Sequence, residues 1–226
     1  QRFVAPLTDT VVMLVLRGWT LQRIVFGHDE AKNEFNRLVY EFNRGQSIAR
    51  EVAEFKLDRK MPRLPVFWQE RKDRALSDYQ RASVKWAMDA PGFAMHLDRG
   101  LGKTACTVQL INMLSIQMDR GELDGGAAKR DGKRMLRSLV IAPKNVRLNW
   151  HREFDKFSHV PGKVVTMRGS KFTRLKRMNE AIRGDDGMLF SVLIASYNGV
   201  CLTTDYLSMV PWDVVVTDEA QYYKDP

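Results

Sequence analysis

Two short groups of residues in this chain have the types and the spacing needed to handle phosphates. The first is Gly100-Leu101-Gly102-Lys103-Thr104, which lies between a predicted strand at 93–97 and a predicted helix from about 102 to 118. Glycines let main-chain N–H groups turn toward phosphate oxygens, and a helix N-terminus adds partial positive charge. In such a loop the lysine contacts the β- and γ-phosphates, and the threonine hydroxyl binds Mg²⁺.

The alternative for this group is an exposed glycine turn that caps a helix. The full phosphate-loop consensus has glycine where this chain has Leu97, so the letters alone are a weak signal. The order of strand, loop and helix carries more weight, and it favours phosphate binding.

The second group is Asp218-Glu219, which follows the apolar run from Trp212 to Thr217. Ligands of open α/β sheets bind at the carboxyl ends of the strands, which is the edge where the phosphate loop is also expected. We expect Asp218 to hold Mg²⁺ through water and Glu219 to orient or deprotonate the attacking water. The alternative is a helix N-cap with two acids placed at the positive end of the helix dipole. With this pair, the predicted catalytic residues are Lys103, Asp218 and Glu219, and the predicted metal ligands are Thr104 and Asp218.

From residue 76 onward, the pattern alternates between strands and helices, which predicts an α/β fold with a parallel sheet. The predicted helices cover 77–90, 102–118, 146–157 and 170–184, and the predicted strands cover 93–97, 139–142, 163–167, 189–195 and 213–217. The helix at 170–184 is expected to start at a Ser170 cap and to bury Phe172, Leu175, Met178 and Ile182.

The first seventy residues differ in pattern and predict a small α+β accessory domain at 1–70, followed by a second domain at 71–226. Apolar, β-branched runs at 10–16 and 20–26 predict a hairpin. Apolar residues at 31, 35, 38 and 42 predict a helix that stops at Gly45, and 46–75 is expected to be a connector around a short helix.

Composition narrows the class of protein. The chain has 226 residues, of which 44% are hydrophobic, and this excludes wholesale disorder. No apolar run is long enough to span a bilayer, so no membrane partner is expected. Two cysteines give no disulfide framework, which favours a reducing, intracellular compartment. The net charge of +9 makes the chain a candidate polyanion binder, although many basic proteins bind no nucleic acid.

Five ordered motifs resemble SNF2-type superfamily 2 ATPases over about residues 76–226. They are Leu76, Tyr79-Gln80, Val84 and Trp86 with Asp98 to Thr104; Pro143, Asn149-Trp150 and Glu153; Ala195-Ser196-Tyr197; and Trp212-Asp213 through Asp218-Glu219-Ala220-Gln221 with Lys224. The resemblance implies a RecA-like P-loop lobe that stops after its Walker B motif. Gln221 stands where the family usually has histidine, and Leu97 and Arg99 replace the residues more usual before the glycines.

The resemblance also implies ligands and partners. ATP and Mg²⁺ are the expected cofactors, with Gln80 at the adenine and Gly100, Leu101, Gly102, Lys103, Thr104 and Ala105 around the phosphates. Lys144, Ser196 and Tyr197 are expected to face the backbone of double-stranded DNA without reading its sequence. A second RecA-like lobe is expected to complete the site, because this lobe alone lacks the arginines that act on the γ-phosphate. The implied function is that of the ATP-binding lobe of a DNA-dependent ATPase that translocates on duplex DNA or remodels protein–DNA complexes.

Two other functions stay open. One is a strand-separating helicase or a restriction-type translocase, against which Tyr79-Gln80 with Asn149-Trp150 favours the SNF2 branch. The other is a non-catalytic nucleic-acid-binding module, against which the complete set of Lys103, Thr104 and Asp218-Glu219 argues. Bacterial or phage-infected cytoplasm is the favoured location, with the nucleus as the alternative.

Overall fold

The computed structural model describes residues 29–90, 92–98, 100–128, 134–183 and 187–220. It divides the chain into two compact units, one of 1–62 with 89–94 and the other of 63–88 with 95–226. The hairpin predicted at 10–26 and the position of Gln221 lie outside the described residues. The domain boundary near residue 70 stays a prediction.

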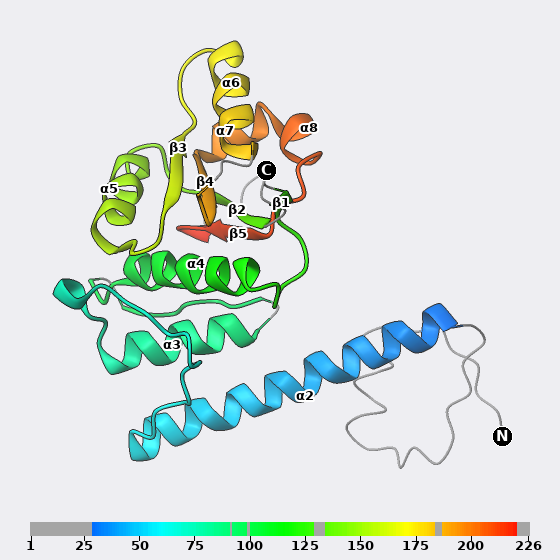
Figure 1. Cartoon of the computed structure of the whole chain (residues 1–226), viewed down its shortest axis with the longest axis vertical. Helices are drawn as coiled ribbons and strands as arrows, with labels where there is room; N and C mark the ends of the chain where they lie inside the picture. The colour runs from blue at the N-terminus through cyan, green and yellow to red at the C-terminus, as the bar shows by residue number, and fades with distance from the viewer. Residues whose placement is uncertain (1–28, 91, 99, 129–133, 184–186, 221–226) are drawn as a thin grey trace. The chain divides into compact units, whose positions relative to one another are not determined.

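The first unit contains one long helix, α2, which runs from Asp29 to Asp58 (Figure 1). The prediction that this helix ends at Gly45 is wrong. A glycine in a helix interior costs about 1 kcal/mol relative to alanine, which is too little to end a helix whose following residues are helix formers such as Gln46, Ala49 and Glu51. The helix instead ends where Arg59 adopts a left-handed φ of 57°.

The second unit is built on a four-stranded parallel sheet in the order β5–β2–β4–β3. The strands are β2 (Arg134–Ile141), β3 (Gly162–Thr166), β4 (Phe190–Ala195) and β5 (Val214–Thr217), and the short β1 (Ala127–Ala128) pairs antiparallel with the start of β2. The strands predicted near 163–167, 189–195 and 213–217 are confirmed, and the strand predicted at 139–142 starts five residues earlier.

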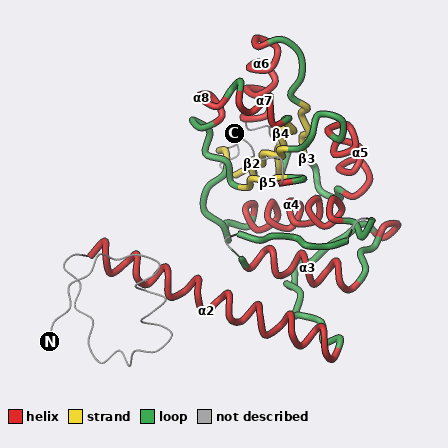
Figure 2. The backbone as a smooth tube through the Cα atoms, turned by 180° about the vertical axis from the view of Figure 1, so that it is seen from behind, coloured by secondary structure: helices red, strands yellow, loops and turns green. Residues whose placement is uncertain are grey.

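Helices cover both faces of the sheet (Figure 2). The helices that pack on the sheet are α4 (Lys103–Asp119), α5 (Arg147–Phe157), α6 (Lys171–Ile182), α7 (Tyr197–Cys201) and α8 (Thr204–Leu207). Helix α3 (Asp78–Asp89) packs against α4 through a separate core, and a 3₁₀ turn spans Lys72–Arg74. Alternate residues of β2 separate two cores: Leu136 and Val140 pack with α4 and α5, whereas Leu139 and Ile141 pack with α6 and α8. This arrangement confirms the predicted α/β class and is consistent with a RecA-like lobe. Within the described part of the chain, no helix combines the length and the apolar character needed to cross a bilayer.

The strand predicted at 93–97 does not form. Residues 93–98 have no strand pairing, and Met95 and Leu97 pack instead against a core shared by α3 and α4, which includes Val84 and Cys106. The prediction of a strand at 93–97 is therefore wrong. The apolar side of this segment is covered by helices rather than by a neighbouring strand, and such a choice between partners is invisible to periodicity.

Two residues that the sequence places in the core are exposed. Phe172 is 79% exposed, because the buried face of α6 begins with the second turn and contains Met178 and Ala181. The Ser170 cap is confirmed, since its hydroxyl accepts from Thr173 N. Val215 is 55% exposed on β5, a strand that pairs with β2 along one side.

Two glycines with no atoms close to an added Cβ allow a test of whether α2 continues through Gly45. At both Gly45 and Gly121 an added Cβ meets nothing within 4 Å, but Gly121 has a φ of +72° whereas Gly45 lies inside the helix. We expect Gly45→Ala to stabilise its unit by about 0.5–1 kcal/mol, because alanine loses less backbone entropy in a helix. Gly121→Ala should destabilise by about 1–2 kcal/mol, the cost of a left-handed backbone with a Cβ. Urea unfolding followed by far-UV circular dichroism measures both, and equal effects of the same sign would contradict the assignment.

Candidate functional site

The loop at 100–102 forms a concave turn at the start of α4. Gly100 and Gly102 have φ of +83° and +81°, which glycine adopts at little cost. Gly102 is the N-cap of α4, and the first helical hydrogen bond runs from Cys106 N to its carbonyl oxygen at 2.9 Å. The N–H groups of the residues between them therefore have no partner inside the helix, and they can donate to an anion at the helix N-terminus.

Lys103 closes this loop from the inside. Its Nζ donates to the carbonyl oxygens of Leu97 (2.5 Å) and Asp98 (3.2 Å). Thr104 is half-buried beside it, and Ala105 is buried in the core between α3 and α4, so only the main-chain N–H of Ala105 is available to a ligand.

Gln80 and Tyr79, on α3, hold the loop from the other side. Gln80 Nε2 and the Tyr79 hydroxyl both donate to the carbonyl oxygen of Leu101, at 3.0 and 3.3 Å. The other end of the Gln80 amide accepts from Ser77 N at 2.9 Å. A Cβ at Gly102 would lie 2.4 Å from Gln80 Nε2, so a larger residue would displace the Gln80 amide from its position, and the φ of +81° favours glycine there. The contact of Gln80 with adenine stays a prediction, and the loop-holding role is one that the sequence analysis missed.

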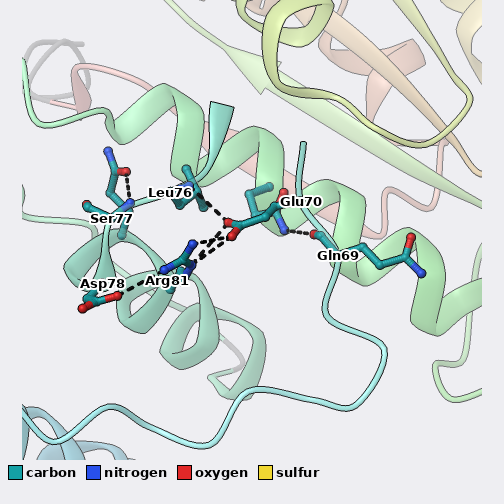
Figure 3. A network of polar contacts seen from close by, with 8 residues as sticks. Gln69, Glu70, Leu76, Ser77, Asp78 and Arg81 are labelled. Carbon is teal, nitrogen blue, oxygen red and sulfur yellow. Dashed lines mark hydrogen bonds and ion pairs between the residues drawn. The ribbon is translucent and has the colours of Figure 1, made fainter. Parts of the chain in front are cut away.

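A charged network fixes the start of α3 and thereby Gln80 (Figure 3). Arg81 bonds Glu70 through Nη2 at 2.5 Å and Asp78 through Nη1 at 3.1 Å. The second oxygen of Glu70 accepts from Leu76 N at 3.1 Å. The hydrogen bond with Glu70 raises the pKa of Arg81 above its ordinary value, so this cation is permanent.

Asp218 directly follows β5 and is held by three bonds. Its N–H donates to Ile141 O at 2.8 Å, which continues the pairing with β2. The indole Nε1 of Trp150 donates to its carboxylate oxygen Oδ2 at 2.9 Å, and the Tyr197 hydroxyl donates to its main-chain oxygen at 2.5 Å. Trp150 is 3% exposed, and nothing in the sequence indicated its bond to Asp218.

Glu219, the next residue, is exposed and has a φ of 55°. This left-handed conformation is costly for a residue with a Cβ, and such residues concentrate at functional sites. The strands of the sheet are parallel, and Figure 1 shows β5 pointing toward the side of the unit on which α4 begins. The acid pair and the glycine loop thus lie at the same edge of the sheet, as the sequence analysis expected.

A cation-lined cavity of about 330 Å³ opens at the ends of the neighbouring strands. It is lined by residues that follow β2, β3 and β4, with no acidic side chain among them: Lys144, Arg147, Met167, Arg168, Gly169, Arg174, Ser196, Asn198 and Gly199. Two of the predicted DNA contacts, Lys144 and Ser196, therefore meet here. The third, Tyr197, does not line the cavity.

Within the described part of the chain, two arginines of this cavity, Arg147 and Arg174, form no ion pair with a carboxylate. Arg147 donates to the main-chain oxygens of Met167 and Lys144, both uncharged acceptors. Burial, and then the nearby charge of Arg168, lower the pKa of Arg147 below its ordinary value. Nε of Arg174 is buried and has no hydrogen-bond partner among the described residues. An anion in the cavity would relieve both.

The three arginines were missed as a group by the sequence analysis. Arg168 and Arg174 fall in a stretch, 163–183, with seven basic residues and one acidic residue. This excess was the available signal, but it resembles the ordinary solvated face of a surface helix. Only the folded sheet brings these residues next to Arg147, which follows a different strand.

The residues at the glycine loop fit a magnesium-bound polyphosphate better than a protein-held metal. The loop offers N–H donors and a lysine, while the described residues contain no cluster of three or more His, Cys, Asp or Glu side chains. Mg²⁺ is usually bound by one or two carboxylates, phosphate oxygens and water. The assignment of Asp218 and the Thr104 hydroxyl to that role stays a prediction.

Known proteins match between about two thirds and three quarters of this chain. It is 32% identical over 155 residues to an uncharacterized ATP-dependent helicase of Mycoplasma genitalium, covering 66% of this chain and 13% of the relative. It is 28% identical over 163 residues to the ISWI chromatin-remodeling complex ATPase ISW2 of Saccharomyces cerevisiae, covering 68% of this chain and 12% of the relative. It is 26% identical over 195 residues to the DNA excision repair protein ERCC-6-like 2 of Mus musculus, covering 75% of this chain and 12% of the relative. The chain thus spans about an eighth of the length of these relatives.

The model of the SNF2-related domain matches residues 79–226, which include the glycine loop, the residues lining the basic cavity and the acid pair. The chain belongs to the SNF2-related domain family.

Proposed function

We propose that this chain is the ATP-binding lobe of a DNA-dependent ATPase that moves along duplex DNA or remodels protein–DNA complexes. The observation that carries the proposal is a combination of three features in one unit: a phosphate-loop geometry at the start of α4, an acid pair after β5, and a cavity lined by four cations. Relatives named as an ATP-dependent helicase and as a chromatin-remodeling ATPase support it. ATP and DNA are found inside cells, and we favour a bacterial or phage-infected cytoplasm, with the nucleus as the alternative.

At the nucleotide, each residue has a separate task. The main-chain N–H groups at the start of α4 bind the phosphates. The ammonium of Lys103 leaves the carbonyl oxygens of Leu97 and Asp98 and pairs with the β- and γ-phosphates. Mg²⁺, when bound, neutralises charge that develops on the phosphates. Asp218 holds a metal-bound water, and Glu219 orients the attacking water and accepts its proton.

At the DNA, the cations of the cavity bind backbone phosphates. Lys144 and Arg168 are exposed at its rim, and Arg147 and Arg174 are half-buried. Contacts of this kind fix the position of a duplex without reading its bases. We therefore expect binding without sequence preference, with Ser196 adding a polar contact and Tyr197 lying behind it.

Substitutions at Lys103 and Glu219 separate binding from chemistry in the full-length protein. Lys103→Ala removes the cation that meets the phosphates, so ATP affinity and hydrolysis should both collapse. Glu219→Gln keeps the volume and leaves Asp218 in place, so ATP affinity should stay within a few fold while hydrolysis falls by about two orders of magnitude or more. Equilibrium ATP binding and steady-state turnover of both variants measure this. Normal turnover by Glu219→Gln, or loss of its ATP binding, would show that the roles are assigned wrongly.

The 226-residue chain by itself should bind Mg·ATP weakly and hydrolyse it at a negligible rate, with or without DNA. The physical reason is that a second lobe is proposed to supply arginines to the γ-phosphate, and arginines of this type accelerate related phosphoryl transfer by about 10³–10⁵-fold. A coupled ATPase assay on the purified chain checks this, and robust DNA-stimulated turnover would refute the need for a second lobe.

Binding of duplex DNA should weaken steeply between about 50 and 200 mM salt, because phosphate contacts release counterions. Lys144→Ala and Arg168→Ala should each lower affinity for all sequences and reduce the log–log salt slope by about 1. Lys176→Ala is the matched control, since it removes an exposed cation from α6 that does not line the cavity. Fluorescence anisotropy at several salt concentrations provides the slopes. Equal slopes for all three variants would exclude the cavity as the DNA contact.

A further inference from the structure

Two side chains join the acid pair to the basic cavity. On α5, Arg147 lines the cavity and Trp150, three residues later, donates its indole N–H to Asp218 Oδ2. After strand β4, Ser196 lines the cavity, and its neighbour Tyr197 donates a hydrogen bond to the main-chain oxygen of Asp218. The first link is the first turn of α5. The second is the junction between Ser196, whose backbone is extended, and Tyr197 at the start of α7.

The Trp150 link is built rigidly. The indole is 3% exposed and stacks in a row with Phe154 and Phe190, with ring centroids 6.4 and 5.8 Å apart. A buried indole keeps few alternative orientations, and its N–H needs an acceptor. The acceptor here is a half-buried carboxylate, so the bond holds one oxygen of Asp218 in a fixed direction and leaves Oδ1 for a metal-bound water.

The Tyr197 link acts on the main chain of the same residue. Its hydroxyl bonds the carbonyl oxygen of Asp218, and the Asp218 N–H bonds Ile141 on β2. The peptide groups on both sides of the acid are thereby fixed, immediately before the left-handed Glu219. Ser196 fixes the tyrosine in turn, because its hydroxyl caps α7 by accepting from Gly199 N at 3.1 Å.

We propose that Trp150 is a positioning residue for Asp218, and that through Trp150 and Tyr197 an anion in the basic cavity alters how Asp218 holds its metal ion. This inference rests on the proposed function and extends it by naming the contacts through which DNA reaches the ATP site. A phosphate at Arg147 restrains the first turn of α5, and the restraint reaches the carboxylate through one hydrogen bond. Because binding linkage is reciprocal, DNA and metal–nucleotide should strengthen each other by the same factor.

The test measures metal binding rather than turnover. Mn²⁺, used as the probe for Mg²⁺, is titrated by electron paramagnetic resonance into the full-length protein with ADP, with and without duplex DNA. Trp150→Phe keeps a buried aromatic ring and removes the N–H donor. We expect its Mn²⁺ dissociation constant to rise about tenfold, the lower end of losses seen when a ligand's supporting hydrogen bond is removed. DNA affinity measured without nucleotide and metal should stay within about twofold, since no phosphate contact is lost.

Trp212→Phe is the matched control. Trp212 also donates its indole N–H, but to Leu207 O at 3.0 Å, away from the acid pair. Mn²⁺ affinity should be unchanged in this variant even if its melting temperature falls. Equal losses of Mn²⁺ affinity in the two variants, or none in Trp150→Phe, would overturn the positioning role. A DNA-induced gain in Mn²⁺ affinity that is as large in Trp150→Phe as in the unmodified protein would overturn the coupling.

Tyr197→Phe keeps the test decisive if Trp150→Phe does not fold. It removes only a hydroxyl from a half-buried ring, and we expect a rise in the Mn²⁺ dissociation constant of about threefold, as for an ordinary hydrogen bond. Tyr206→Phe, at a side chain 40% exposed on α8, should have no effect. A Tyr197→Phe protein with unchanged Mn²⁺ affinity would refute its part of the link. An unmodified protein that binds no Mn·ADP would refute the proposed function itself, and this inference with it.

Discussion

Parallel pairing along β2 is the constraint on which the site depends. β2 pairs with β4 on one side and with β5 on the other, in continuous register from residue 136 to Ile141. Because all four strands point the same way, the segments that follow them emerge at one edge. At that edge lie the acid pair after β5, Arg147 of α5 after β2, Arg168 after β3 and Ser196 after β4. A sheet with one strand reversed would separate these groups.

Asp213 secures the opposite end of the same pair of strands. Its carboxylate accepts from Gly126 N and from Arg137 N, both at 2.7 Å, and lies 3.8 Å from Nε of Arg137. Both side chains are 11% exposed, so the charges are largely removed from water and compensate each other. A buried acid that bonds main-chain N–H groups of two segments fixes where β5 starts, and hence where Asp218 falls at its end.

Opposite charges are kept apart on the functional edge. The carboxylates lie at the β5 end, and the cations lie at the ends of β2 and β3, with Trp150 and Tyr197 between them. Burial, and then the nearby charge of Arg168, lower the pKa of Arg147. Because no acidic side chain lines the basic cavity, the cavity favours anions electrostatically. The lysine of the glycine loop, Lys103, is likewise bonded to uncharged carbonyl oxygens, those of Leu97 and Asp98.

The sequence by itself determined the α/β class, most of the helices and strands, and the residue types of the site. These features depend on local properties: the period of apolar residues, the Ser170 cap and the order of glycines, lysine and acids. Local pattern failed at Phe172 and at the segment 93–97, because a buried face and a strand depend on what packs against them. It failed at Gly45 because one interior glycine costs too little to end a helix. Only the tertiary structure decided that Gln80 holds the phosphate loop, that Arg147 meets Arg168 and Arg174, and that the Trp150 indole bonds Asp218. These contacts join residues 20 to 70 positions apart, and their geometry is set by the register of the sheet, which no single segment encodes.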